Sequence, residues 1–273
     1  MWTLLMGGLY PQQIDATVRG LLSSKDGPQP AVLDIGTGPG IWAIEMAQEF
    51  PNTKVIGIDL IDIKPTRLPP NCSLVKGDVT KGLPDFAEAF DVIHCRSVAG
   101  HVLDPVALVQ TARSCLKPGG ILIFADGSFI YNERKVIFKP ADDDGVVPDD
   151  KSWVARYMLE VKARVPVKDT KNIPGEYLIR WMQEGGGLEN IDGDFYFCPI
   201  NWNGDGVKHG RELGEIMGHL MFDFVTATKS VLLINGISDE VVESWVKRIH
   251  EELDEPKVRM YLKWNMAWAR KPV

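Results

Sequence analysis

The chain has 273 residues, 45% of them hydrophobic and 25% charged, a composition typical of a globular protein with a sizeable buried core. Its net charge of −7 and pI of about 5.3 argue against a nucleic-acid substrate held through phosphate contacts. Because Cys72, Cys95, Cys115 and Cys198 have no C-x-x-C spacing, we expect buried free thiols in a reducing compartment and no zinc site.

The N-terminal segment, Met1 to Tyr10, is apolar but lacks the basic region and cleavage site of a signal peptide. It is also too short to span a membrane. We therefore expect a helix that docks on the protein core, and no membrane partner. A second helix is predicted over residues 12–23.

A short apolar run at 31–35 is typical of a strand buried on both faces of a parallel sheet. Three glycines follow at every second position, Gly36, Gly38 and Gly40. Glycine allows positive φ and lets a ligand approach the backbone closely. The strand and turn therefore predict a ligand site at the carboxyl end of the strand.

The next elements continue this pattern. Residues 41–50 predict a helix that ends before Pro51, and residues 54–59 predict a second strand. This strand ends in Asp59, whose carboxylate can accept hydrogen bonds from both hydroxyls of a ribose. A strand, glycine turn, helix, strand and terminal acid in this order indicate the nucleotide-binding half of a doubly wound α/β sheet.

The position of Asp34 separates the possible nucleotides. A dinucleotide fingerprint reads G-x-G-x-x-G, whereas here an acid precedes glycines at every second position. A carboxylate at the mouth of the turn would repel a pyrophosphate. It suits a cationic group, such as the amino group of a methionine moiety. A nicotinamide or flavin site is the alternative.

Further strands are predicted at 73–76, 91–95 and 120–125. A helix at 104–115 begins with Asp104 and Pro105, a favourable pair of N-cap and first helical residues. These elements extend the sheet beyond its first two strands.

The run from Asp34 to Gly40 resembles motif I of the class I S-adenosylmethionine-dependent methyltransferases. The segments 72–79, 90–96 and 116–125 resemble the third, fourth and fifth strands of that family, in the same order. In those enzymes an acid after the third strand binds the adenine amino group and the next residue packs on the ring. The resemblance assigns these roles to Asp78 and Val79.

The resemblance therefore implies that the chain binds S-adenosylmethionine and releases S-adenosylhomocysteine. The residues implied in cofactor binding are Asp34, Gly36, Thr37, Gly38, Gly40, Asp59, Leu60, Asp78, Val79 and Arg96.

Two motifs resemble a fungal family of small-molecule methyltransferases more closely still. These motifs run from Val32 to Glu45 and from Phe90 to Gly100, and the Gly-Gly-Leu-Tyr segment at 7–10 also matches. That family includes tailoring enzymes of secondary metabolism and a global regulator of secondary metabolism in filamentous fungi. Its members often carry a longer leader, which leaves a longer natural chain and a different N-terminal lid both open.

The second half of the chain has a mixed pattern. Its predicted elements are an acidic loop at 142–150, helices at 152–164, 177–183, 210–234 and 239–253, and strands at 191–200 and 258–268. A minimal class I domain needs one helix between its last two strands. The extra helices, around 130–175 and 205–235, therefore predict a cap that shapes the substrate pocket.

The predicted fold is a single α/β domain with a doubly wound, seven-stranded, mostly parallel sheet and helical cap insertions in its C-terminal half. We assign residues 1–128 to the cofactor-binding half and 129–235 to the substrate and cap insertions. The last helix and strand occupy 236–273.

Methyl transfer to a hydroxyl benefits from a general base, and histidine is the usual choice. His101 follows the fourth strand, at the edge where ligands bind in open α/β sheets, and is the predicted base. His94 lies inside the strand and is expected in the core, while His209 and His219 are reserve candidates.

Aromatic residues are candidates for lining a substrate pocket, although each alone is more often a core residue. They are Trp153, Trp181, Trp202, Phe222 and Phe224, and Trp42 either packs by the cofactor or lies in the core. Metal-dependent catechol chemistry needs an acid after the fourth strand and an acid–amide pair after the fifth. Arg96 and the Asp126–Gly127 pair occupy those positions, so no metal is expected.

We therefore expect a cytoplasmic enzyme that methylates a small-molecule acceptor, most readily at an oxygen of an aromatic or other secondary metabolite. N- or S-methylation of a similar metabolite is the alternative within the enzyme class. A cofactor-binding regulator that acts through protein partners is the alternative from another class. The sequence leaves the oligomeric state open.

Overall fold

The computed structural model describes residues 1–23, 27–62, 65–143, 147–165, 174–254 and 258–273. The chain forms two compact units, which we call the sheet unit and the helical unit. The sheet unit comprises Met6–Asp126, Pro174–Asp194 and Asn265–Val273, and the helical unit comprises Met1–Leu5, Gly127–Ile173 and Phe195–Trp264.

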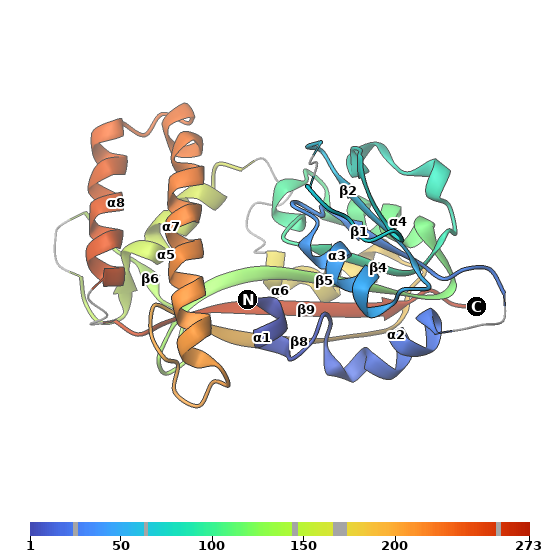
Figure 1. The fold of residues 1–273 in the computed structure, drawn as a ribbon. Helices are drawn as coiled ribbons and strands as arrows, with labels where there is room; N and C mark the ends of the chain where they lie inside the picture. Colours follow the sequence, from blue (N-terminus) through green and yellow to red (C-terminus); the bar gives the residue numbers. More distant parts are fainter. Residues whose placement is uncertain (24–26, 63–64, 144–146, 166–173, 255–257) are drawn as a thin grey trace. The chain divides into compact units, whose positions relative to one another are not determined.

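A seven-stranded sheet, in the order β3-β2-β1-β4-β5-β9-β8, forms the centre of the sheet unit (Figure 1). The strands are β1 (Ala31–Ile35), β2 (Lys54–Asp59), β3 (Cys72–Lys76), β4 (Phe90–Arg96), β5 (Leu116–Asn132), β8 (Glu189–Ile200) and β9 (Met260–Arg270). The first five pair in parallel. The order reverses between β1 and β4, so the carboxyl ends of these two strands form a topological switch point, where open α/β sheets bind ligands.

Helices cover both faces of the sheet in this unit. They are α2 (Asp15–Leu22), α3 (Ile41–Glu49), α4 (Pro105–Cys115) and α6 (Pro174–Gly185). Leu33 and Ile35 of β1 pack in one buried cluster with residues of α4 and α6. Because side chains alternate along a strand, Asp34 points to the opposite face, where α3 packs on β1 and β2.

The predicted elements of the first half are largely confirmed. Strands β1 and β2 have the predicted bounds, and β3 and β4 differ by one residue at their ends. The segment 12–23 is one 3-10 turn, Gln12–Ile14, followed by α2. The fifth strand is much longer than the predicted 120–125, because Leu116 already pairs with Phe90 and the Lys-Pro-Gly-Gly segment forms an irregularity in the ladder.

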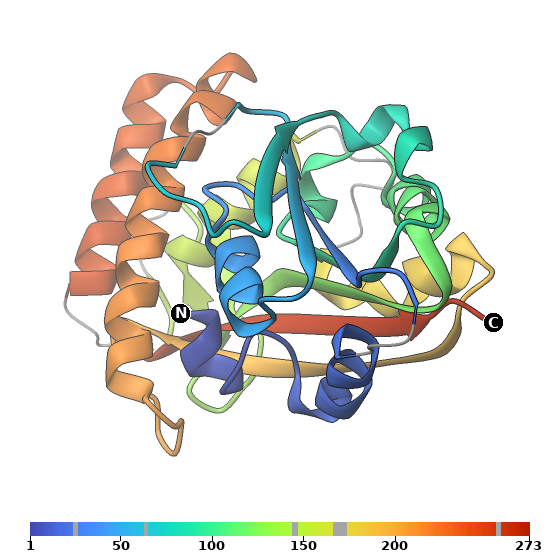
Figure 2. The same ribbon diagram turned by 45° about the vertical axis from the view of Figure 1, so that its right-hand side comes forward.

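The helical unit packs three long helices around its own core. It contains α5 (Trp153–Lys162), α7 (Gly210–Ile234), α8 (Asp239–Asp254) and a small sheet of β6 (Lys139–Pro140) and β7 (Lys151–Ser152). Helices α7 and α8 lie side by side (Figure 2). The N-terminal helix α1 (Trp2–Met6) contributes Leu4 and Leu5 to this core, as the predicted docking requires.

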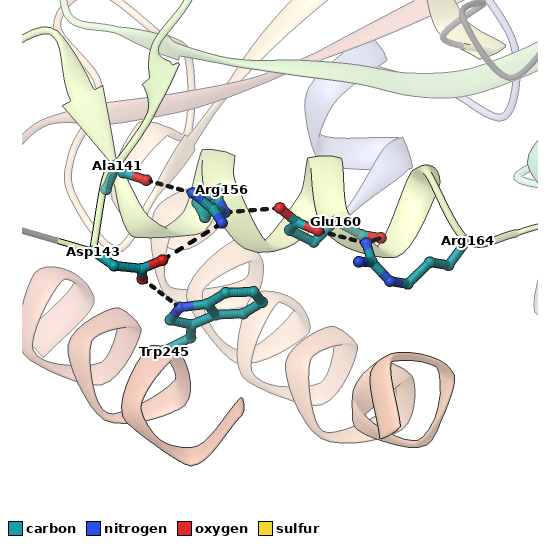
Figure 3. A network of polar contacts seen from close by, with 6 residues as sticks. All are labelled: Ala141, Asp143, Arg156, Glu160, Arg164 and Trp245. Carbon is teal, nitrogen blue, oxygen red and sulfur yellow. Dashed lines mark hydrogen bonds and ion pairs between the residues drawn. The ribbon is translucent and has the colours of Figure 1, made fainter. Parts of the chain in front are cut away.

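Arg156 on α5 joins three parts of the helical unit (Figure 3). Its guanidinium donates to the carbonyl of Ala141 at 3.1 Å and forms ion pairs with Asp143 and Glu160. It also stacks over the ring of Trp245 on α8, whose Nε1 donates to Asp143 at 3.0 Å. Residues 144–146 of the predicted acidic loop lie outside the described residues.

The two units divide the chain differently from the predicted ranges. The boundary at Asp126 lies close to the predicted 128, but α8 groups with α7 in the helical unit, and the last strand is divided between the two units after Trp264. By length and composition, α7 alone among the described helices would be able to cross a membrane. Its residues Leu213, Met217 and Met221 are buried in the core of the helical unit.

A buried carboxylate, Glu252 on α8, covers the start of α5. Its Oε2 accepts hydrogen bonds from the Ser152 hydroxyl and from the backbone N–H groups of Trp153 and Val154, at 3.0–3.1 Å. Its Oε1 is buried with no hydrogen-bond partner within the described part of the chain. Burial raises the pKa of the Glu252 carboxyl from 4.5 to about 7, although the three hydrogen bonds oppose the shift.

This pKa predicts that the protein loses stability as the pH rises. Folding favours the protonated carboxyl. The contribution of Glu252 to the free energy of unfolding is therefore complete below pH 4.5 and is lost as the pH rises through about 7. The full effect corresponds to about 3 kcal/mol. We expect Glu252→Gln to flatten the pH dependence of the unfolding free energy, measured by urea titration between pH 5 and 8. The exposed neighbour Glu251→Gln is the control, and an unchanged slope in Glu252→Gln would contradict the assignment.

Candidate functional site

Each glycine of the turn after β1 has positive φ: +67° at Gly36, +53° at Gly38 and +81° at Gly40. A Cβ on Gly36 would lie 2.2 Å from Val98, and one on Gly40 would lie 2.7 Å from Leu74. A Cβ on Gly38 would have no protein atom within 4 Å. Neighbouring side chains and positive φ therefore disfavour a side chain at 36 and 40, whereas the space beside the Cα of Gly38 is open.

The turn is fixed to β2 by its backbone. The N–H groups of Gly36 and Thr37 both donate to the carbonyl of Ile58, at 2.8 and 3.1 Å. The N–H of Gly38 donates to Asp59 Oδ2 at 2.9 Å. The turn and the end of β2 thus form one rigid corner at the carboxyl edge of the sheet.

A shallow surface hollow lies at this corner, lined by Thr37, Gly38, Asp59, Ile61, Asp62, Leu74 and Val75. Its lining combines carboxylates with apolar side chains. Leu60 and Ile61 are 63% and 67% exposed, which is unusual for large apolar residues next to a buried strand. Acids beside exposed apolar groups suit a ligand with sugar hydroxyls and a flat apolar ring.

Asp78 and Val79 follow β3 at the same edge, as predicted. Asp78 Oδ1 accepts hydrogen bonds from the backbone N–H and the hydroxyl of Thr80, at 3.0 and 2.6 Å. These bonds, with Lys81 3.5 Å away, lower the pKa of Asp78 and keep it ionised. Val79 is partly buried against the sheet-unit core. Their contact with an adenine ring stays a prediction.

Asp34 is buried, with an exposed fraction of 3%. Its Oδ2 accepts a hydrogen bond from the Thr37 hydroxyl at 2.7 Å, and its Oδ1 lies 2.7 Å from Nδ1 of His94. Both carboxylate oxygens of Asp34 thus have partners within the protein, and its contact with the amino group of a ligand stays a prediction. Asp34 supports the turn from within the protein.

His94 is a core residue, as predicted, but its pairing with Asp34 is absent from the sequence prediction. The two residues are partners in the β1–β4 register. Trp42 of α3 stacks on the His94 ring at a centroid distance of 3.9 Å. The signal available in the sequence was weak: an acid and a histidine near the ends of two strands expected to be neighbours.

The segment after β4 lies against the glycine turn. Val98 is the residue that excludes a side chain at Gly36, and the N–H of His101 donates to its carbonyl at 2.8 Å. His101 is exposed, in the 3-10 turn Ala99–His101. The preceding Arg96 lies near Asp34; burial lowers the pKa of its guanidinium, while Asp34 and Glu45 oppose the shift.

Other predicted candidates lie elsewhere. Trp181 is buried in the core of the sheet unit, and Trp153 is buried in the core of the helical unit. These two rings are core residues, the alternative that the sequence predicted for each of them. His209 pairs with Glu212 at 3.7 Å, and His219 Nδ1 lies 2.7 Å from the carbonyl oxygen of Glu215; both are on the helical unit.

Residues 11–187 match a protein family described as a methyltransferase domain. The chain is 34% identical over 247 residues to methyltransferase pytC of Aspergillus terreus, a match that covers 89% of this chain and 72% of that protein. It is 24% identical over 272 residues to the secondary metabolism regulator laeA of Coprinopsis cinerea, covering 98% of this chain and 64% of that protein. The chain thus spans less than two thirds of the length of this laeA protein.

Among solved structures, phosphoethanolamine N-methyltransferase 2 of Haemonchus contortus, in complex with S-adenosyl-L-methionine, aligns with a TM-score of 0.50. The alignment covers 96% of this chain and 52% of that chain, at 15% sequence identity. At this identity the similarity concerns the fold alone.

Proposed function

Because the chain belongs to the methyltransferase domain family and has the class I fold, we propose that it binds S-adenosylmethionine and methylates a small molecule. An oxygen of an aromatic or other secondary metabolite is the acceptor we favour. The observation that carries the proposal is the corner at Gly38, where the backbone is open and the Asp59 carboxylate lines the adjoining hollow.

The residues at this corner fit the donor. An open glycine allows the methionine part to approach the backbone, Asp59 can accept hydrogen bonds from the ribose hydroxyls, and the exposed Ile61 can pack on the adenine ring. When bound, S-adenosylmethionine supplies a methyl group whose bond to a positive sulfur breaks as the acceptor attacks, leaving S-adenosylhomocysteine. The protein must then align the acceptor and receive its proton, and His101 is our candidate for the latter role.

A labelled-methyl assay with phenols, thiols and amines tests the proposal. We expect label from S-adenosylmethionine to appear in a phenol or another hydroxyl compound. Label only in amines or thiols would replace the favoured acceptor by N- or S-methylation. Failure of the protein to bind S-adenosylmethionine, measured by calorimetry, would overturn the proposal.

A regulatory role is the second candidate, because a relative that covers 98% of the chain is named as a regulator of secondary metabolism. A protein of this kind would bind S-adenosylmethionine but act through protein partners. Donor binding without label in any small molecule would favour this candidate over the enzyme.

Gly38→Ala separates donor binding from folding. Ala at positive φ costs about 1 kcal/mol of stability, and the new methyl group meets no protein atom. The methyl group instead occupies the space proposed for the donor, so we expect the donor Kd to rise by about tenfold or more. Calorimetry measures the Kd, and thermal unfolding measures the stability cost.

Gly186→Ala is the matched control for this substitution. Gly186 also has positive φ, +66°, with no protein atom within 4 Å of an added Cβ, and it lies in the turn before β8. We expect the same loss of stability in both variants and normal donor binding in Gly186→Ala. Equal donor affinities in the two variants would contradict a donor site at Gly38.

A further inference from the structure

A chain of buried contacts behind the glycine turn is centred on His94. Asp34 and His94 are 3% and 2% exposed, and the carboxylate Oδ1 lies 2.7 Å from the imidazole Nδ1. Burial lowers the pKa of His94, and the nearby Arg96 acts in the same direction, although Asp34 opposes the effect. The imidazole is therefore neutral at neutral pH, and its Nδ1–H donates to the carboxylate.

The Asp34 carboxylate also contacts the glycine turn. Its second oxygen accepts the Thr37 hydroxyl at 2.7 Å, which fixes the side chain of Thr37 over β2. The fit there is tight, because a Cβ on Gly57 would lie 2.5 Å from Thr37 Oγ1. The carbonyl of Thr37 in turn accepts the N–H of Gly40 at 3.0 Å. The rotamer of Asp34 is thus linked, through Thr37, to the backbone on both sides of Gly38.

The other face of His94 is fixed as well. The Trp42 ring stacks on the imidazole, with 12° between the ring planes. The indole Nε1 of Trp42 donates to the carbonyl of Leu9 at 2.7 Å, so α3 and the N-terminal segment hold the stack. With one face packed and Nδ1 bonded to Asp34, the imidazole has a fixed orientation.

We propose that His94 is a positioning residue for the donor site: its Nδ1–H holds Asp34, which holds Thr37 and so keeps the turn around Gly38 in its binding conformation. This inference rests on the proposed function, because it assumes that the turn binds S-adenosylmethionine. His94 itself is buried and acts through Asp34 and Thr37.

Two substitutions separate the hydrogen bond from the ring. His94→Phe keeps a ring against Trp42 but has no N–H, whereas His94→Asn keeps an N–H donor near the position of Nδ1 but has no ring. We expect the donor Kd, measured by calorimetry, to rise about tenfold or more in His94→Phe and to stay close to wild type in His94→Asn. His250→Phe, on an exposed histidine that contacts the Phe222 ring in the helical unit, is the control.

Equal affinities in wild type, His94→Phe and His94→Asn would overturn the proposal. Equal losses in the two variants would also overturn it, because they would assign the effect to ring packing.

A second measurement does not depend on the donor. Thermal unfolding of His94→Phe, Thr37→Val and the double variant forms a double-mutant cycle. We expect the losses in Tm not to add, because both single variants break the same connection through Asp34. If wild type binds no S-adenosylmethionine, the proposed function fails and the donor-positioning role of His94 fails with it. If wild type binds the donor, additive losses would overturn the inference, because His94 and Thr37 would then act independently, and non-additive losses would support it.

Discussion

Replacing Asp59 with alanine is expected to weaken the binding of S-adenosylmethionine by about 100-fold or more. Asp59 ends β2, and its carboxylate lines the hollow beside Gly38. Two ribose hydroxyls would each lose a hydrogen bond to a charged acceptor, worth roughly 1.5–3 kcal/mol apiece. The substitution also removes the 2.9 Å bond that anchors the N–H of Gly38. Calorimetric titration measures the change.

Two further variants sharpen this test. Asp59→Asn keeps an oxygen that can accept from Gly38 but removes the charge, so we expect an intermediate affinity. Asp85→Ala removes an exposed acid from a 3-10 turn outside the site and is expected to bind the donor normally. Unchanged donor affinity in Asp59→Ala would show that the ribose does not bind at this corner of the sheet.

His101→Ala is expected to lower kcat by about 100-fold with a hydroxyl acceptor, while the donor Kd stays unchanged. A general base speeds the reaction by taking the proton from the attacking oxygen. His101 lies just past β4, joined to Val98, which covers Gly36. Steady-state kinetics with the acceptor identified in the labelled-methyl screen gives kcat, and calorimetry gives the donor Kd.

His250→Ala serves as the matched control, because it removes an exposed histidine from α8. We expect its kcat to equal that of wild type. If His101→Ala keeps full activity, His101 is not the base, and the reserve candidates His209 and His219 are then tested in the same way. The donor-site proposal is tested separately, by the Asp59 and Gly38 variants.

The first half of the chain was predictable because its signals are local. The apolar run at 31–35, the glycines after it and the acid at 59 each specify a strand, a turn or a strand end. Parallel strands joined by right-handed crossovers bring their carboxyl ends to one edge, so the proximity of Asp59 to the turn follows from the order of elements. The fold similarity to a class I methyltransferase agrees with this order.

The second half was harder to interpret, because its helices were predictable but their grouping was not. The predicted helix at 210–234 has the same bounds as α7. That α8 packs with α7, and that Glu252 of α8 covers the start of α5, depends on contacts across about 100 residues of chain. Local periodicity shows that a helix has an apolar face, but it does not show which element covers that face.

The sequence alone determined the first half of the fold: the order of strand, glycine turn, helix and acid-terminated strand, and hence the class I fold and its family. Only the tertiary structure decided which side chains meet behind the turn. Asp34 and His94 are 60 residues apart and pair because the β1–β4 register places them opposite each other on the face that α3 covers. Register and burial depend on the packing of whole elements, so the contacts of Asp34 with His94 and Thr37 follow from the tertiary structure and not from the local pattern.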